Sequence, residues 1–234
     1  MTQDPALAAQ ASEANSGSLL ERLSAVPVAV LSDAAGALGL PDTVLTGVRR
    51  ICGRRVAGYA RTVARELAPA NATQADIDPS LGMGTQMVID SCKPNEVIVI
   101  GVHGNTDFAV WGDNMATRAH AVGVRGMVTD GAIRDVDEMD GVGMAVFAAA
   151  TTPRQAFRRL VTTSINGPVV VGGVRVCPGD LIVADGDGVI AIGAGKAAEL
   201  VARAEALHAV ENEMQGYIRA GNSLVSAVEK YKAR

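Results

Sequence analysis

Aromatic residues are scarce in this chain of 234 residues, at 3% of the total, and no basic stripe runs along it. Protein faces that bind nucleic acid need clustered positive charge, and those that stack bases also need aromatic side chains. The formal net charge is instead −4. We therefore expect no nucleic-acid partner. The hydrophobic fraction is an ordinary 48%, so the core must be built from Ala, Val, Ile, Leu and Met.

Paired cysteines and targeting segments are also missing. Cys52, Cys92 and Cys177 are widely spaced and form no CxxC pair, which excludes a disulfide framework or a cysteine zinc site and predicts reduced thiols in a cytoplasmic protein. Residues 1–18 lack the basic start and apolar stretch of a signal peptide, and no apolar run reaches the roughly 18 residues of a membrane span. We expect a flexible tail over residues 1–18, a single domain over residues 19–234 and no membrane contact.

Motifs of several other enzyme classes are incomplete. Residues 193–195, Gly-Ala-Gly, resemble a dinucleotide fingerprint, but the roughly forty residues after them are nearly all helical and supply no second strand. We interpret them as a helix start. None of the histidines has a His partner at metal-ligand spacing. His120 is predicted to be a packing or surface residue, whereas His103, beside a strand end, stays a minor candidate.

Apolar periodicity and turn residues predict an α/β fold. Strands are expected at residues 54–63, 96–100, 126–129, 144–148, 181–184 and 189–192, with a hairpin over residues 169–176. Helices are expected at residues 18–23, 32–37, 82–91, 113–122, 196–219 and 224–232. Asp130-Gly131 is interpreted as a turn that ends its strand, and Ser32-Asp33 as a helix cap. Strand, helix and strand at these lengths indicate some parallel pairing.

The segment over residues 111–138, WGDNMATRAHAVGVRGMVTDGAIRDVDE, combines a helix start with charged residues that follow a strand. The free amides where the helix begins, at residues 112–115, make an anion site that suits the carboxylate of a small acid. Arg134 and Asp135 lie beyond the carboxyl end of the next predicted strand, where ligands gather in open α/β sheets. The helix start and the strand end can therefore meet in one cleft.

The residue types in this segment suit a 2-oxo acid. Asp135 can hold a divalent cation that keeps several waters, and Arg134 can donate to an oxo or enolate oxygen. Asp113 can position a water as a proton shuttle. The competing interpretation is an Arg134–Asp135 ion pair that caps a turn, with Asp113 as a helix cap. The residue types alone leave these two interpretations equally open.

The same segment resembles the RraA-like family, which includes class II pyruvate aldolases such as 4-hydroxy-4-methyl-2-oxoglutarate aldolase. The aldolase signature of that family is Asp, twenty residues, Arg-Asp, two residues and an acid. Here Asp113 precedes Arg134-Asp135 by twenty residues, and Glu138 supplies the final acid. The resemblance extends over residues 172–192, the strand near residues 54–63 and Ser32-Asp33-Ala34, and so covers most of the chain after residue 25.

The resemblance implies an α/β fold of the swivelling β/β/α type, with a mixed sheet flanked by helices and a C-terminal helical segment. It implies a lyase that cleaves a 4-hydroxy-2-oxo acid by retro-aldol chemistry to release pyruvate and that also acts as an oxaloacetate decarboxylase. In this family Arg134 would bind the pyruvyl oxo group and steady the enolate. Asp135 would anchor Mg²⁺ or Mn²⁺, and Asp113 would orient the water that transfers a proton.

Further implied contacts concern the pyruvate carboxylate and a neighbouring subunit. The substrate would lie against Gly112, and the amides of Asn114 and Met115 would hold its carboxylate. A glutamate from the C-terminal helix of a neighbouring subunit, Glu211 or Glu213, would complete the surroundings of the metal in a homotrimer or homohexamer. Family members often have leucines where Asn114 and Met115 stand, which changes the shape of the pocket.

A second reading of the same resemblance is a non-catalytic regulator of the RraA type, which inhibits an RNA-degrading endonuclease by contact. Such regulators can lack the acid that follows the arginine, whereas this chain has Asp135. The enzyme is therefore favoured. Menaquinone methyl transfer, a third label used in the family, is disfavoured because no methyl-donor glycine loop is present.

Overall fold

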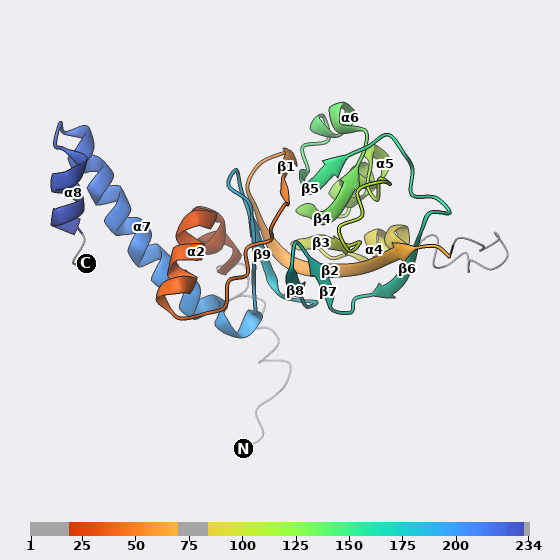
Figure 1. Cartoon of the computed structure of the whole chain (residues 1–234), viewed down its shortest axis with the longest axis horizontal. Coiled ribbons are helices and arrows are strands. Elements are labelled where there is room, and N and C mark those ends of the chain that lie inside the picture. Colours follow the sequence, from red (N-terminus) through yellow and green to blue (C-terminus); the bar gives the residue numbers. More distant parts are fainter. Residues whose placement is uncertain (1–18, 70–83, 232–234) are drawn as a thin grey trace, which may run out of the picture. The chain divides into compact units, whose positions relative to one another are not determined.

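The computed structural model describes residues 19–69 and 84–231 (Figure 1). These residues form two compact units, one over residues 43–195 and one that joins the chain before residue 43 to the chain after residue 195. The expected tail, residues 1–18, lies outside the described residues. The expected single domain over residues 19–234 stays a prediction.

The larger unit is built on a mixed sheet of eight strands. Its order is β1-β5-β4-β3-β2-β9-β10, and β6 pairs with the carboxyl-terminal part of β2. The strands are β1 (Arg49–Cys52), β2 (Val56–Leu67), β3 (Glu96–Gly101), β4 (Gly126–Ile133), β5 (Ala145–Thr151), β6 (Leu160–Ile165), β9 (Leu181–Ala184) and β10 (Val189–Ile192). Strands β2 to β5 run parallel, so their carboxyl ends share one edge. A hairpin of β7 (Val169–Val171) and β8 (Val174–Val176) forms a separate small sheet.

Successive side chains of the central strands point to opposite faces of the sheet, and both faces are buried. Ile98 and Ile100 of β3 pack in one core cluster, and Val97 and Val99 pack in the other, as the twofold period of a strand requires. The first cluster includes buried residues of α4 (Gly84–Ser91), α5 (Asp113–Ala121) and α6 (Val136–Asp140). The second includes the buried valines of the β7–β8 hairpin. The expected α/β class with a mixed sheet and flanking helices is confirmed.

The smaller unit is helical. Residues 19–25 form a helix, followed by α2 (Val28–Ala37), α7 (Ala197–Arg219) and α8 (Leu224–Tyr231), and a 3₁₀ turn at Ala194–Lys196 lies at the boundary with the larger unit. Arg22 binds Glu205 of α7 through two hydrogen bonds of 2.8 and 2.7 Å. The prediction that Ser32-Asp33 caps the second helix is wrong, because Pro27 stands at the N-cap and the helix begins at Val28. A helix start tolerates proline, because the first N–H groups of a helix have no partner within the helix and proline has no N–H.

The predicted turn at Asp130-Gly131 is also wrong, since β4 continues to Ile133. Asp130 is buried, and its two carboxylate oxygens accept the N–H groups of Val102 and Gly104 at 2.8 and 2.9 Å. Burial raises the pKa of the Asp130 carboxyl above its ordinary value, against the lowering effect of those amides. Asp130 therefore anchors the loop after β3, and Gly131 follows it because a Cβ there would lie 2.6 Å from Cγ2 of Val102.

Three elements of the larger unit were not anticipated: β1, β6 and α6. Each is short and lies at a sheet edge or directly after a strand, where local periodicity is weak. All three cysteines are free, as expected. Within residues 19–69 and 84–231, none of the helices combines the length and the apolar character that a membrane crossing needs.

Candidate active site

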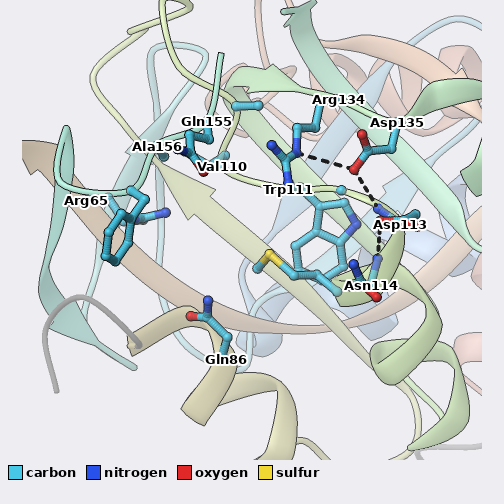
Figure 2. Close-up of a pocket in the computed structure, with 14 residues that line it drawn as sticks. Arg65, Gln86, Val110, Trp111, Asp113, Asn114, Arg134, Asp135, Gln155 and Ala156 are labelled. Atoms are coloured by element: carbon cyan, nitrogen blue, oxygen red, sulfur yellow. Dashed lines mark hydrogen bonds and ion pairs between the residues drawn. The ribbon is translucent and has the colours of Figure 1, made fainter. Parts of the chain in front are cut away.

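A pocket of about 210 Å³ lies where the parallel strands β3, β4 and β5 end (Figure 2). Most of its wall comes from three connections, which are the chain between β3 and α5, the residues after β4 and the residues after β5, and β2 and α4 contribute one residue each. The residues that line it include Ala109, Val110, Trp111, Gly112, Asp113, Asn114, Met115, Arg134, Asp135, Gln155, Ala156 and Phe157. The carboxyl edge of a parallel sheet is where the strand ends leave such a crevice.

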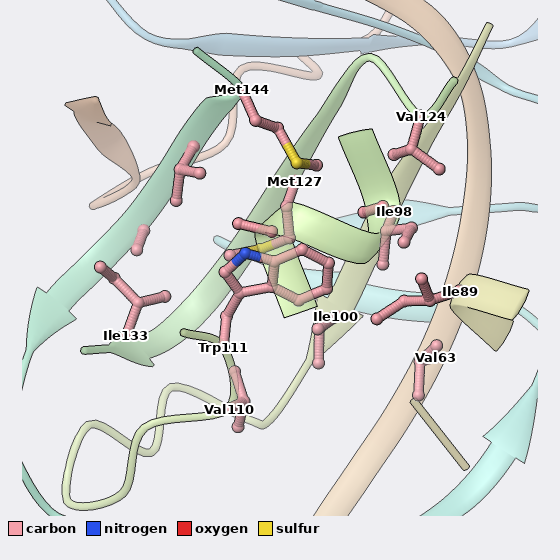
Figure 3. Packing of buried hydrophobic residues seen from close by; sticks show 14 of the residues in the cluster. Val63, Ile89, Ile98, Ile100, Val110, Trp111, Val124, Met127, Ile133 and Met144 are labelled. Carbon is pink, nitrogen blue, oxygen red and sulfur yellow. The ribbon is translucent and has the colours of Figure 1, made fainter. Parts of the chain in front are cut away.

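Trp111 fixes the floor of the pocket. Its side chain is 1% exposed and packs in the cluster that contains Ile100, Met127 and Ile133 (Figure 3). The backbone around it pairs with the end of β4, because Val110 donates to the carbonyl of Ala132 at 2.9 Å and Arg134 donates to the carbonyl of Trp111 at 3.0 Å. The buried indole and these two bonds hold the start of α5 beside the end of β4.

Arg134 and Asp135 form an ion pair at this junction, with Nε of Arg134 3.3 Å from Oδ2 of Asp135. The same oxygen accepts the backbone N–H of Asp113 at 3.4 Å. Asp135 has a left-handed backbone, φ 58° and ψ 43°, at the N-cap of α6. A non-glycine residue rarely adopts this conformation, and such strained positions concentrate at functional sites.

Gly112 allows Asp135 to approach the helix start this closely. A Cβ at residue 112 would lie 2.5 Å from Oδ2 of Asp135 and 3.3 Å from Cγ of Arg134. Any larger residue would therefore displace the carboxylate or the arginine. The glycine is needed for this close approach, because its own φ of −165° is open to every residue.

Residues 113–115, in the first turn of α5, line the pocket, but not all of their backbone amides are free. The N–H of Asn114 donates to Oδ1 of its neighbour Asp113 at 2.7 Å. The N–H of Met115 has no hydrogen-bond partner among the described residues. A bound carboxylate would meet the Met115 amide directly and would have to displace Asp113 to reach that of Asn114.

The structure thus brings together six residues that the sequence singled out: Gly112, Asp113, Asn114, Met115, Arg134 and Asp135. Glu211 and Glu213 lie on α7 in the smaller unit and are not among the residues that line the pocket. His103, which is exposed and 3.7 Å from Glu66, and His120, which is exposed on α5, also lie outside the lining.

Arg65 is a lining residue that the sequence did not reveal. It lies near the end of β2, is 7% exposed, and donates from Nη2 to the carbonyl of Leu160 at 2.8 Å. Burial lowers the pKa of its guanidinium to about 10. No sequence signal marks it, because the same strand also contains Arg61, Thr62 and Glu66, and the strand pattern cannot say which polar side chain faces a pocket.

A divalent cation fits the donors at Asp135 to a limited extent. Its side chain is 30% exposed, and Oδ1 accepts no hydrogen bond from the described residues, so this oxygen is available. Asp135 also borders a second hollow of about 290 Å³, lined with Val136, Thr151 and Thr152. No group of three His, Cys, Asp or Glu side chains that could hold a metal occurs in the described parts of the chain. A cation here would depend on one carboxylate and on waters, a coordination that Mg²⁺ accepts.

Comparison with known proteins gives a family. A family model described as RraA-like, Aldolase/RraA, matches residues 28–191. Protein DlpA of Legionella pneumophila is 28% identical over 213 residues, which make up 91% of this chain and 34% of DlpA. A protein of Halalkalibacterium halodurans named "Putative 4-hydroxy-4-methyl-2-oxoglutarate aldolase" is 32% identical over 139 residues, 59% of this chain and 64% of that protein. The chain therefore spans less than two thirds of either relative.

Solved structures show the same fold. An uncharacterized protein from Pseudomonas syringae pv. tomato has a TM-score of 0.80 at 32% identity, over 92% of this chain and 94% of that one. RraAS2 from Streptomyces coelicolor, described as an unusual member of the RNase ES inhibitor RraA protein family, has a TM-score of 0.74 at 28% identity, over 87% and 98% of the two chains. The RraA-like fold expected from the sequence is confirmed.

Proposed function

From the premise that the chain belongs to the RraA-like family, we propose that it is a divalent-metal-dependent lyase that cleaves a 4-hydroxy-2-oxo acid and releases pyruvate. One observation carries the proposal: Arg134, Asp135, Asp113 and the first turn of α5 line a single pocket. The aldolase name of the Halalkalibacterium relative supports it. The substrate is of the 4-hydroxy-4-methyl-2-oxoglutarate type.

The pyruvyl half of the substrate lies at the start of α5. Its carboxylate accepts the N–H of Met115, where the positive end of the helix dipole adds attraction. Arg134 donates to the C2 oxo oxygen. Because Asp135 holds Nε of Arg134, the terminal nitrogens of the guanidinium are directed at the substrate without further ordering.

Asp135 would hold the metal ion, Mg²⁺ or Mn²⁺, because its Oδ1 accepts no hydrogen bond from the described residues. The ion, when bound, supplies a Lewis acid that stabilises negative charge on the oxo oxygen. Arg134 stabilises the same charge by hydrogen bonding, and it does so best as the oxygen becomes an enolate.

Bond cleavage needs a base and then an acid. A water oriented by Asp113 accepts the proton of the C4 hydroxyl, the C3–C4 bond breaks, and its electron pair forms the enolate of pyruvate while C4 becomes a carbonyl. The water then returns a proton to C3 to give pyruvate. In oxaloacetate the same C3–C4 bond breaks with loss of CO₂, so one site serves both reactions.

The site is completed in a homotrimer or homohexamer in which Glu211 of a neighbouring subunit approaches Asp135. The C-terminal helices offer a surface for this assembly. In α8, Leu224 and Val225 are 62% and 68% exposed and Val228 is 40% exposed. Large apolar side chains exposed together often mark a protein contact.

A second candidate function, contact inhibition of a ribonuclease, is favoured by the likeness to RraAS2. It would make no use of the strained Asp135 or of the Arg134–Asp135 pair. A regulator would also retain its effect in the presence of a chelator, whereas the lyase would not.

An assay of pyruvate release tests the proposal. The full-length protein is incubated with 4-hydroxy-4-methyl-2-oxoglutarate or with oxaloacetate, first with Mg²⁺ or Mn²⁺ and then with excess EDTA, and pyruvate is followed through lactate dehydrogenase. We expect turnover with both acids and its loss with EDTA. No metal-dependent pyruvate from these acids or from a wider panel of 2-oxo acids would eliminate the lyase.

A further inference from the structure

Arg65 is a buried cation in the pocket wall that has no carboxylate partner among residues 19–69 and 84–231. Within the part of the chain that the structure describes, its guanidinium makes one hydrogen bond, from Nη2 to the carbonyl of Leu160. Its Nε is buried, and among the described residues it has no hydrogen-bond partner and no acidic side chain in an ion pair with it. The arginines that do form ion pairs among the described residues, such as Arg118 and Arg22, are far more exposed than Arg65.

Such an arrangement is unfavourable unless a ligand supplies the missing charge. Removal of a guanidinium from water costs free energy, and a buried charge is normally paired. The lowered pKa of about 10 records this cost, yet it leaves Arg65 charged at neutral pH. A purely structural role, as donor to one carbonyl of β6, would need only one of the five N–H groups of an arginine.

Arg65 lies at the other end of the pocket from the proposed pyruvyl site. Figure 2 shows it on the side opposite to Asp113 and Asp135, with its nitrogen end directed toward the pocket. The floor between the two ends is formed by Val110 and Trp111, both buried. The exposed Gln86 and Gln155 also line the pocket and add neutral donors.

We propose that Arg65 binds the distal carboxylate of the substrate and so restricts the site to dicarboxylic 2-oxo acids. The assignment rests on the proposed function for which end of the pocket holds the pyruvyl half. A substrate with a methyl group in place of that carboxylate would leave Arg65 buried and unpaired. Such mismatches against a polar site reduce binding far more than a missing methylene does.

Binding of two unreactive acids tests the proposal without turnover. 2-Oxoglutarate and 2-oxopentanoate have the same chain length and differ in the distal carboxylate alone. Their dissociation constants are measured by calorimetry with Mg²⁺ on the wild type, Arg65→Gln and Arg65→Lys, with Arg61→Gln as the control. Arg61 is on the same strand but outside the pocket lining, and donates to Ser91.

We expect the wild type to bind 2-oxoglutarate about 10- to 100-fold more tightly than 2-oxopentanoate, the range for a hydrogen bond to a charged group. Arg65→Gln should remove this preference, Arg65→Lys should keep only part of it, and Arg61→Gln should retain all of it. The proposal is overturned if the wild type has no preference, if it binds neither acid, or if the preference survives in both Arg65 variants. Arg65→Lys keeps the test decisive if Arg65→Gln does not fold.

Turnover then separates the two proposals. 4-Hydroxy-4-methyl-2-oxopentanoate carries a methyl group where 4-hydroxy-4-methyl-2-oxoglutarate carries its distal carboxylate. In Arg65→Gln, kcat/KM should fall about 10- to 100-fold for the dicarboxylate and stay unchanged for the monocarboxylate. If no variant releases pyruvate but the binding preference depends on Arg65, the lyase fails and the distal anion site stands. If Arg65→Gln lowers kcat/KM equally for both substrates, the assignment of Arg65 to the distal carboxylate fails and the lyase stands.

Discussion

Two arginines of one pocket have opposite surroundings. Arg134 follows β4, has a side chain that is 41% exposed, and is paired with Asp135 at 3.3 Å. Arg65 lies within β2, is 7% exposed, and has a backbone carbonyl as its recorded partner. The pairing fixes the direction of Arg134 at the cost of part of its charge, which suits a group that must act on one oxygen. The charge of Arg65 is left for a ligand, which suits recognition. The following variants test this difference.

Asp135→Asn should have the largest effect. The amide keeps the size of the side chain but removes the negative charge that pairs with Arg134 and that, in the proposed function, also binds the cation. We expect pyruvate release to fall about 10³-fold, several kcal/mol of transition-state stabilisation, and the response to added Mg²⁺ to disappear. Initial rates over a Mg²⁺ titration measure both. A full rate with an ordinary Mg²⁺ response would show that the metal is held elsewhere.

Arg134→Lys should have the next largest effect. Lysine retains the charge but not the planar fork that pairs with Asp135 and, in the proposed function, also donates to the oxo oxygen. We expect kcat to fall about 10²-fold, as for loss of one donor to a developing oxyanion, with little change in KM. A fall that appears in KM alone would assign Arg134 to ground-state binding, as proposed here for Arg65.

Gly112→Ala should disturb the Arg134–Asp135 ion pair by steric contact. The added Cβ would lie 2.5 Å from Oδ2 of Asp135, so the carboxylate must move. We expect this displacement of the Asp135 carboxylate, by less than a few ångströms, to lower kcat about tenfold and to weaken activation by Mg²⁺. Gly193→Ala is the matched control, because a Cβ there meets nothing within 4 Å. Equal rates for the two variants would mean that the close approach of Asp135 has no part in turnover.

Asn114→Leu should have the smallest effect. The Asn114 side chain is exposed, and the proposed carboxylate contact is made by backbone N–H groups at the start of α5. We expect kcat/KM to change by no more than about threefold, in line with exposed substitutions elsewhere. A tenfold loss would show that the Asn114 amide side chain itself contacts substrate.

The contrast between the two arginines also explains what the sequence could predict. The segment over residues 112–135 was found because its residues are close in sequence and its strand and helix patterns are strong. The strands at Leu181–Ala184 and Val189–Ile192 were predicted with their observed bounds for the same reason.

The remainder depends on contacts between distant segments. Arg65 meets the pocket because β2 is long enough to continue past the strands beside it, and β6 then pairs with its extension. The sequence predicts a turn at Asp130 because Asp-Gly is common in turns. In the structure its carboxylate instead accepts hydrogen bonds from backbone amides of a loop that is distant in sequence. Neither the position of Arg65 nor the hydrogen bonds of Asp130 can be predicted from the residues that are adjacent in sequence.

Exchange of the methyl protons of pyruvate for deuterium tests the central claim most directly, because it reports enolate formation and needs no knowledge of the other half of the substrate. Pyruvate is incubated in D₂O with the full-length protein and Mg²⁺, and its methyl signal is followed by proton NMR. The account predicts a steady loss of the signal, well above the rate without protein, that stops with EDTA and in Arg134→Ala and Asp135→Asn. No exchange above that background with either Mg²⁺ or Mn²⁺, or equal exchange in both variants, would contradict it.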